Sequence, residues 1–141
     1  MFGFFKKKKD VNTFEGRVAG LSVDDTMLQS YQEKAQEQLP YLIDFMQNHE
    51  KDDELFRYAV KSRFEEGEDA EHMWVQVNDF VGDYFIGKLV NEPNTIKLIK
   101  YGDPVKVHRK NVEDWILEDF LVHAKVGAFS SEYIRNKANQ K

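Results

Sequence analysis

The chain between residues 71 and 115 alternates short apolar segments with turn residues, and no connection within it is long enough for a helix. Residues 73–78 alternate between two faces, 84–90 form a second apolar segment, and 105–107 form a third. Parallel neighbours need a crossover of about a dozen residues or more, so strands spaced this closely pair antiparallel. The stretch therefore predicts a curved antiparallel sheet or a small SH3-like partial barrel.

Further strands are predicted before and within this stretch. Residues 55–64 place aromatic and aliphatic side chains on one face and basic side chains on the other, which is typical of a half-buried strand. The run 65–69 is then an exposed acidic loop. Turn residues at 91–94 predict a hairpin into another strand at 95–100.

The C-terminal part of the chain gives weaker patterns. Asn111 is expected to cap one helical turn over 111–116. Residues 116–126 remain open between interpretations, a last strand among them. Ser130 or Ser131 is expected to cap a terminal helix on which Tyr133, Ile134 and Lys137 share a face.

Gly87 lies inside the strand expected at 84–90, where glycine weakens a strand and often marks a bulge or a close backbone approach. We expect a sharp bend there, or a bulky neighbour such as Trp74 or Trp115 across the backbone. A Cβ at position 87 would then collide, so Gly87 is predicted to be structural. Gly82 lies in a turn and serves as its control.

An amphipathic helix is predicted before the sheet. Its apolar stripe recurs in steps of three or four residues, at Leu28, Tyr31, Ala35, Leu39, Leu42 and Met46. Ser22 is the expected N-cap. Pro40 removes the amide that would bond the carbonyl of Gln36, so a kink or a break is expected there. The stripe needs an apolar partner, and the sheet is the one available.

These patterns together predict an α+β fold, in which an N-terminal long kinked helix packs on a curved antiparallel sheet with a C-terminal helix after it. A length of 141 residues suits one domain with a sizeable core. Residues 1–20 are assigned to a tail and lead-in, and 21–141 to a single domain. Its central sheet spans about residues 55–126.

Charge and composition bound the classes of partner. The chain has no cysteine, which excludes disulfides and fits a reducing cytoplasm. Its net charge of -5 lacks the basic footprint of nucleic-acid binding and permits steering of a basic protein partner. No apolar run is long enough for a transmembrane segment. Residues 2–9, with phenylalanines and lysines, are expected to be a solvated tail, with peripheral membrane contact as the alternative.

The sequence predicts no metal, cofactor or nucleophile. The four histidines lie far apart without helical ligand spacing. Ser22, Ser130 and Ser131 are expected caps, and the sequence has no strained nucleophile turn of the Gly-x-Ser-x-Gly kind. Glu71, Asp103 and Asp114 would form an acid–base site if the sheet brought them together. Carboxylates of this kind more often fix turns and caps, which is the interpretation we favour.

A binding surface is the remaining kind of site. The candidate binding residues are Trp74, Phe85, Asp103, His108, Asp114 and Trp115. Trp74 is out of phase with its apolar neighbours, so it is expected to face away from them. We expect the long helix to cover it.

Residues 71–115 carry a resemblance to a known family. The matching residues are Glu71, His72, Trp74, Val75, 85–89, Asn91, Pro93, Gly102, Asp103, Val105, Asp114 and Trp115. This stretch resembles the YegJ-like family of small bacterial domains, domain of unknown function 2314. The resemblance implies no activity and no catalytic motif. It leaves the long helix and the C-terminal tail outside the match.

Related small domains are similar to immunity proteins that accompany secreted bacterial toxins. The resemblance therefore implies a non-catalytic protein-binding module, in an immunity-type role against a basic toxin domain. The alternatives are an enzyme that uses Glu71, Asp103 and Asp114, and a membrane-surface accessory protein that uses the Phe-Lys tail.

Overall fold

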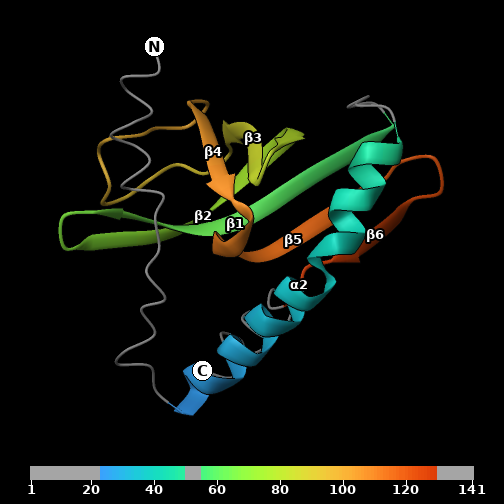
Figure 1. Ribbon diagram of the computed structural model, residues 1–141. Helices are drawn as coiled ribbons and strands as arrows, with labels where there is room; N and C mark the ends of the chain where they lie inside the picture. Colours follow the sequence, from blue (N-terminus) through green and yellow to red (C-terminus); the bar gives the residue numbers. More distant parts are fainter. Residues whose placement is uncertain (1–22, 50–54, 130–141) are drawn as a thin grey trace.

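A single long helix and a six-stranded antiparallel sheet make up the computed structural model, which describes residues 23–49 and 55–129 (Figure 1). The elements are α2 (Val23–Asn48), β1 (Phe56–Glu66), β2 (Asp69–Val81), β3 (Tyr84–Leu89), β4 (Pro104–His108), the 3-10 turn η1 (Arg109–Asn111), β5 (Val112–Asp119) and β6 (Ala124–Gly127). Their order in the sheet is β4-β3-β2-β1-β5-β6. The α+β class and the antiparallel sheet are confirmed.

Some finer features of the expected fold are not confirmed or lie outside the described residues. The strand order describes an open sheet with β4 and β6 at its edges, and the SH3-like partial barrel is not confirmed. The expected C-terminal helix, the Ser22 cap and the N-terminal tail lie outside the described residues. Within the described residues, no helix combines the length and apolar character that crossing a membrane requires.

The helix forms where the apolar stripe predicts it. Ala35, Leu39, Leu42 and Met46 are buried, because steps of three and four residues place them on one face. Pro40 lies inside α2 on its exposed side, and the helix continues through it, so the expected break is wrong. The ribbon changes direction partway along α2 (Figure 1), which fits the loss of one backbone bond at a proline.

Two tight turns shape the first three strands. Gly67 follows β1 and Gly82 follows β2, with φ of 63° and 64°, a backbone conformation that glycine adopts without strain. Each opens a two-residue hairpin connection, between the pairs Glu66–Asp69 and Val81–Tyr84. The acidic run 65–69 is therefore mostly strand, with only residues 67 and 68 in the turn, so the expected exposed loop is wrong.

The segment between β3 and β4 is irregular, so the hairpin and strand expected at 91–100 are wrong. Carboxylates on the neighbouring hairpin take the amides that a strand would have paired. Glu71 accepts from the backbone N–H groups of residues 94, 95 and 96, each at 2.8 Å. Glu66 accepts from those of 97 and 98. Ile96 and Ile99 are thereby held in the core.

The helical turn expected over 111–116 is also wrong, because this segment is strand β5 and pairs with β1. Asn111 ends η1 instead of capping a helix, and the cap is His108, whose Nδ1 accepts from the N–H of Lys110. The register shifts between Lys61 and Ser62, so that Glu113 is an extra residue in β5. The extra residue forms a β-bulge in β5.

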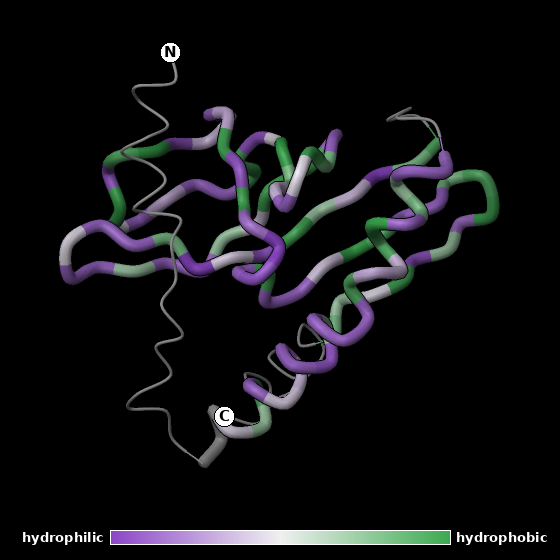
Figure 2. Tube along the Cα trace, in the orientation of Figure 1, coloured by the Kyte–Doolittle hydropathy of each residue, from purple (hydrophilic) through white to green (hydrophobic). Residues whose placement is uncertain are grey.

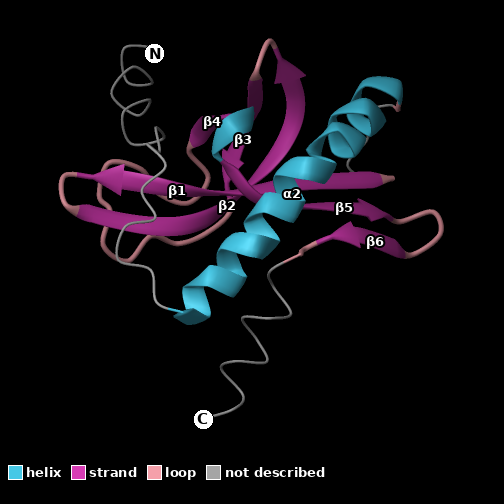
Figure 3. Cartoon of the chain, turned by 60° about the horizontal axis from the view of Figure 1, so that its bottom comes forward, coloured by secondary structure: helices cyan, strands magenta, loops and turns pink. Residues whose placement is uncertain are grey.

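The core lies on one face of the sheet, and α2 lies across that face (Figure 3). Val60 pairs with Val75 on one side and with Trp115 on the other, and all three are fully buried. The Trp115 indole Nε1–H donates to the carbonyl of Ala35 at 3.1 Å, which fixes the helix to β5. Beyond the helix, residues 90–103 cover the far end of the β1–β2 hairpin with Ile96 and Ile99.

We call the opposite side of the sheet the outer face. It is formed by the residues that alternate with the buried ones along each strand. There Lys61 pairs with Trp74, and Gln76 pairs with Lys88. These side chains are exposed or half-buried. A sheet with one buried face explains the alternation of apolar and polar residues along β1 and β2.

Candidate functional site

A groove lined largely by residues with polar side chains separates the N-terminal half of α2 from η1 and the start of β5, with a volume of about 280 Å³. We call it the α2–β5 groove. The N-terminal half of α2 is largely hydrophilic in sequence (Figure 2). The lining residues are Gln29, Gln32, Glu33, Gln36, Lys110, Asn111, Val112 and Glu113. The lining thus includes three glutamines, two glutamates and one lysine.

Helical spacing builds one wall of this groove. Residues 29, 32, 33 and 36 follow one another in steps of three, one and three, so they share one side of α2. This polar side adjoins the apolar stripe. The side chain of Gln36 donates to the carbonyls of Arg109 and Val112 at 2.8 and 2.7 Å. It therefore holds the two walls at a fixed separation.

The bulge in β5 builds the other wall. Glu113, the extra residue, is only 6% exposed, and its Oε1 lies 2.7 Å from Nδ1 of His72 on β2. An ionised carboxylate only accepts, so the imidazole Nδ1–H donates. A buried carboxylate needs such a partner, because desolvation penalises its charged form. The His72 side chain stays about half exposed.

A buried carboxylate that orients an imidazole is also found in catalytic triads, where a nucleophile completes the set. The nearest hydroxyl along the strands is Ser62, which donates to the carbonyl of Asn111 at 3.1 Å. Ser62 belongs to the core face, whereas His72 belongs to the outer face. Ser62 therefore does not complete a triad with the His72–Glu113 pair.

The three carboxylates considered for catalysis hold separate pieces of backbone. Glu71 binds the amides of residues 94–96, and Asp103 accepts from the N–H of Lys100. Asp114 is fully buried and accepts from the N–H groups of Trp115 and Phe129, both at 2.8 Å. Each has a local structural partner, and the geometry gives no support to an acid–base site made of all three.

The electrostatics of Glu71 follow from these bonds. Burial raises the pKa of its carboxyl group, but the three backbone N–H donors and the nearby Lys97 outweigh burial. The pKa of Glu71 is therefore lowered below its ordinary value, and the carboxylate stays ionised. This is the behaviour of a clamp on the loop.

The structure also places the candidate binding residues in different environments. Phe85, Asp114 and Trp115 are fully buried, so a partner has no access to them in this fold. Asp103 closes the turn before β4. His108 caps η1 and touches the Tyr84 ring edge-on at 4.9 Å between centroids.

Trp74 is half-buried, as are Asp103 and His108. It faces outward as expected, on the outer face, where the Lys61 Nζ lies 5.9 Å from its ring centroid. The expectation that α2 covers it is wrong, because the helix packs on the opposite face through Ala35 and Trp115. The residues 23–49 and 55–129 hold no group of three or more side chains that could bind a metal ion.

Sequence reasoning missed the α2–β5 groove. One signal was present, since Gln29, Gln32 and Gln36 repeat at helical spacing beside the apolar stripe. The Glu113 side of the groove gives no local signal. It depends on a register shift against β1, and its partner His72 lies 41 residues away in sequence.

Within residues 23–49 and 55–129 the fold is α+β, with one α-helix packed on an open antiparallel sheet. The chain belongs to the family DUF2314, described as uncharacterised proteins conserved in bacteria, whose model matches residues 24–141. The resemblance found in residues 71–115 is thereby confirmed. The match also includes the long helix and the C-terminal tail, so their expected place outside it is wrong.

Two curated proteins illustrate the relationship. The chain is similar to the uncharacterised protein YegJ of Escherichia coli (strain K12), with 27% identity over 59 residues, which are 42% of this chain and 39% of YegJ. It is also similar to a putative ankyrin repeat protein of Neisseria meningitidis serogroup B, with 38% identity over 52 residues, which are 37% of this chain and 21% of that protein. The match thus spans less than half the length of either relative. No solved structure matches the chain significantly.

Proposed function

We propose that this chain is a non-catalytic protein-binding module, and that the α2–β5 groove receives an extended, basic segment of its partner. The observation that carries the proposal is the lining of the groove. The exposed carboxylate of Glu33 can pair with a lysine or arginine, and the glutamines supply both donors and acceptors for a peptide backbone. Lys110 is the one cation in the lining. It would repel a basic side chain of the partner at its own end of the groove.

The pre-set width of the groove supports the same conclusion. Gln36 ties α2 to η1 and β5, so a segment that binds there meets walls already in place. Preorganised walls reduce the ordering cost of binding. Glu113 is likewise held by His72 rather than swinging freely.

The specific form that we propose is immunity-type neutralisation of a basic toxin domain. A net charge of -5 would speed the encounter with a basic partner by electrostatic steering. The printed name of one relative adds support, because ankyrin repeats stack into extended binding surfaces. The proposal sets this encounter in the cytoplasm, in keeping with a chain that has no cysteine.

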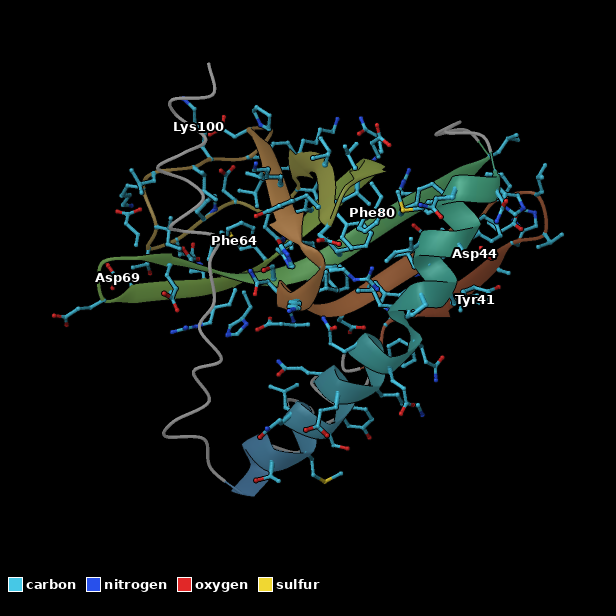
Figure 4. The ribbon with its side chains drawn as sticks, viewed as in Figure 1. Tyr41, Asp44, Phe64, Asp69, Phe80 and Lys100 are labelled. Atoms are coloured by element: carbon cyan, nitrogen blue, oxygen red, sulfur yellow. The ribbon has the colours of Figure 1, made fainter. Side chains whose placement is uncertain are left out.

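The test uses fluorescence anisotropy with a labelled ten-residue peptide that alternates lysine and glycine. The wild type is expected to bind it, and Glu33→Lys is expected to weaken binding about tenfold, because it places a cation in the groove. Asp44→Lys is the matched control, since Asp44 is exposed on the C-terminal half of α2 (Figure 4). Equal weakening by both variants would reduce the effect to net charge and would refute the groove as the site.

A partner-level experiment follows from the immunity-type role. Co-expression with the product of a neighbouring toxin-like gene is expected to give a stable complex that Glu33→Lys disrupts and Asp44→Lys leaves intact. A complex that survives Glu33→Lys would show that the toxin binds elsewhere.

A further inference from the structure

The outer face of β1–β4 concentrates basic side chains on a chain whose net charge is negative. Successive cross-strand rows place Lys61 beside Trp74, then Lys88 beside Gln76, then Lys106 beside Ile86. Because alternate residues of a strand share a face, these rows lie on the side opposite to the buried row of Val60 and Val75. Helix α2 lies on the other side of the sheet (Figure 3).

The carboxylates on this face are engaged with other groups. Asp79 accepts from the N–H of Phe80, and Asp114 is buried against the amides of Trp115 and Phe129. Two further carboxylates pair with cations nearer the sheet ends, Glu65 with Arg63 and Glu118 with Arg57 and Lys125. Asp79 keeps its charge and is half-buried opposite Ile86, whereas Asp114 is fully buried. The three ammonium groups of Lys61, Lys88 and Lys106 outnumber this one accessible carboxylate, so the surface around them is positive on balance.

Two of these lysines are held in place by aromatic rings. The Lys106 Nζ lies 4.6 Å from the centroid of the Tyr84 ring, and the Lys61 Nζ lies 5.9 Å from that of Trp74. Cation–π contacts of this kind fix an ammonium group without removing its charge. Its remaining N–H donors can still bind an anion, and fixing the side chain in advance lowers the ordering cost of binding.

A hollow lies between these two lysine–aromatic pairs. Gln76, Asn78, Gly87 and Lys88 line a space of about 170 Å³. The row of Gln76 and Lys88 is two residues along β2 from Trp74, and its other neighbour is the row of Lys106. Two side-chain amides and one ammonium group are donors that suit a carboxylate.

We propose that the outer face of β1–β4 binds an acidic peptide segment, with one carboxylate in the Lys88 hollow and flanking carboxylates at Lys61 and Lys106. The chemistry favours a peptide over a single-stranded nucleic acid. Nucleic-acid sheets of this kind stack bases on open aromatic faces, whereas Trp74 and Tyr84 each carry a lysine ammonium over the ring. The proposal is independent of the α2–β5 groove, which involves other elements.

The test measures anisotropy of a labelled ten-residue glutamate peptide at low and high salt. The wild type is expected to bind at low salt and to lose affinity as salt screens the charges. Lys88→Glu and Lys106→Glu are each expected to weaken binding about tenfold or more. Lys34→Glu, on the exposed side of α2, makes the same charge change away from the face and is expected to have little effect.

Each outcome decides the proposal. Selective loss in Lys88→Glu and Lys106→Glu, with unchanged melting temperatures, supports it. No binding by the wild type, or equal loss in Lys34→Glu, overturns it. Tighter binding of a ten-residue oligothymidine, competing with the peptide, overturns it in favour of a nucleic acid.

Discussion

Gly87 lies against the backbone of β2, so a larger residue at this position has no room for its Cβ. A Cβ at position 87 would approach the carbonyl oxygen of Gln76 to 2.0 Å and the Cα of Val77 to 2.8 Å. The close neighbour is thus backbone at the β2–β3 bulge, and not Trp74 or Trp115. Backbone cannot move aside as a flexible side chain can.

We therefore predict that Gly87→Val destabilises the domain by about 3 kcal/mol or more, although valine has the higher strand propensity. The free energy of unfolding in urea measures this. Gly82→Asn is the control, because Gly82 has a positive φ and open space around it, and asparagine tolerates that conformation. A neutral Gly87→Val would mean that β2 and β3 do not approach closely at this point.

Tyr58 carries the second prediction at this scale. Its ring is buried, and its hydroxyl has no hydrogen-bond partner among the described residues. An unpartnered buried hydroxyl is costly, so Tyr58→Phe is predicted to leave stability unchanged or to raise it by about 1 kcal/mol. A loss of more than about 1 kcal/mol would show that the hydroxyl is bonded in solution.

The same residue predicts a dependence on alkaline pH. Burial, and then the charge of Asp119, raises the pKa of Tyr58 above its ordinary value of 10.0. The folded state thus keeps this proton longer than the unfolded state. The contribution of the Tyr58 hydroxyl group to the free energy of unfolding is therefore fully present below pH 10.0. It is lost as the pH rises above that value. Tyr58→Phe should show a smaller loss of stability than the wild type across that range.

At the scale of elements, the contact between α2 and the sheet rests on the apolar stripe. Leu42 is fully buried in the middle of that contact. Leu42→Ala is predicted to cost about 2–5 kcal/mol in unfolding free energy, because it removes buried apolar atoms and leaves a cavity. Gln38→Ala, on the exposed side of the same helix, is the control. A cost below about 1 kcal/mol for Leu42→Ala would show that α2 packs loosely.

The loop clamp by Glu71 is the second element-scale prediction. Glu71→Gln is expected to cost about 1–3 kcal/mol at neutral pH, since a neutral amide replaces a carboxylate bound to three N–H groups. The pKa of Glu71 is lowered from 4.5, so its contribution is present above pH 4.5 and lost as pH falls below it. Denaturation at neutral and acidic pH should show the wild type and the variant converging in acid. A constant difference would contradict the clamp.

Helices and strands with a regular spacing of apolar residues could be predicted from the sequence. Segments whose structure depends on residues far away in the sequence could not. The stripe from Leu28 to Met46 and the alternation along β1 specify their own structure. The segment 95–100 reads locally as a strand, but Glu66 and Glu71 take its amides. The segment 111–116 reads as a helical turn, but pairing with β1 makes it β5. In both cases tertiary partners override local preference.

The site shows the same division. The outward direction of Trp74 followed from strand phase alone. Its cover could not be predicted, because the side of the sheet that α2 takes depends on packing with Trp115. The His72–Glu113 pair depends on a bulge in β5, which no local pattern encodes.

In the whole molecule, the two faces of the sheet differ in what they contact. The inner face carries the core, with α2 over one part of it and residues 90–103 over another. The α2–β5 groove lies where helix and sheet separate, and the basic outer face lies on the side away from the helix. The chain therefore offers an acidic groove and a basic face in separate places. Under the two proposals above, the groove takes a basic segment and the outer face takes an acidic one.

The α2–β5 groove is the proposed site for a basic peptide segment. Titration of the isotope-labelled chain with the lysine–glycine peptide, followed by NMR, tests it most directly. The side-chain amide signals of Gln29, Gln32 and Gln36 are predicted to shift first, while those of Gln76 and Asn78 on the outer face stay in place. Unchanged signals from Gln29, Gln32 and Gln36, with shifts elsewhere, would contradict the claim.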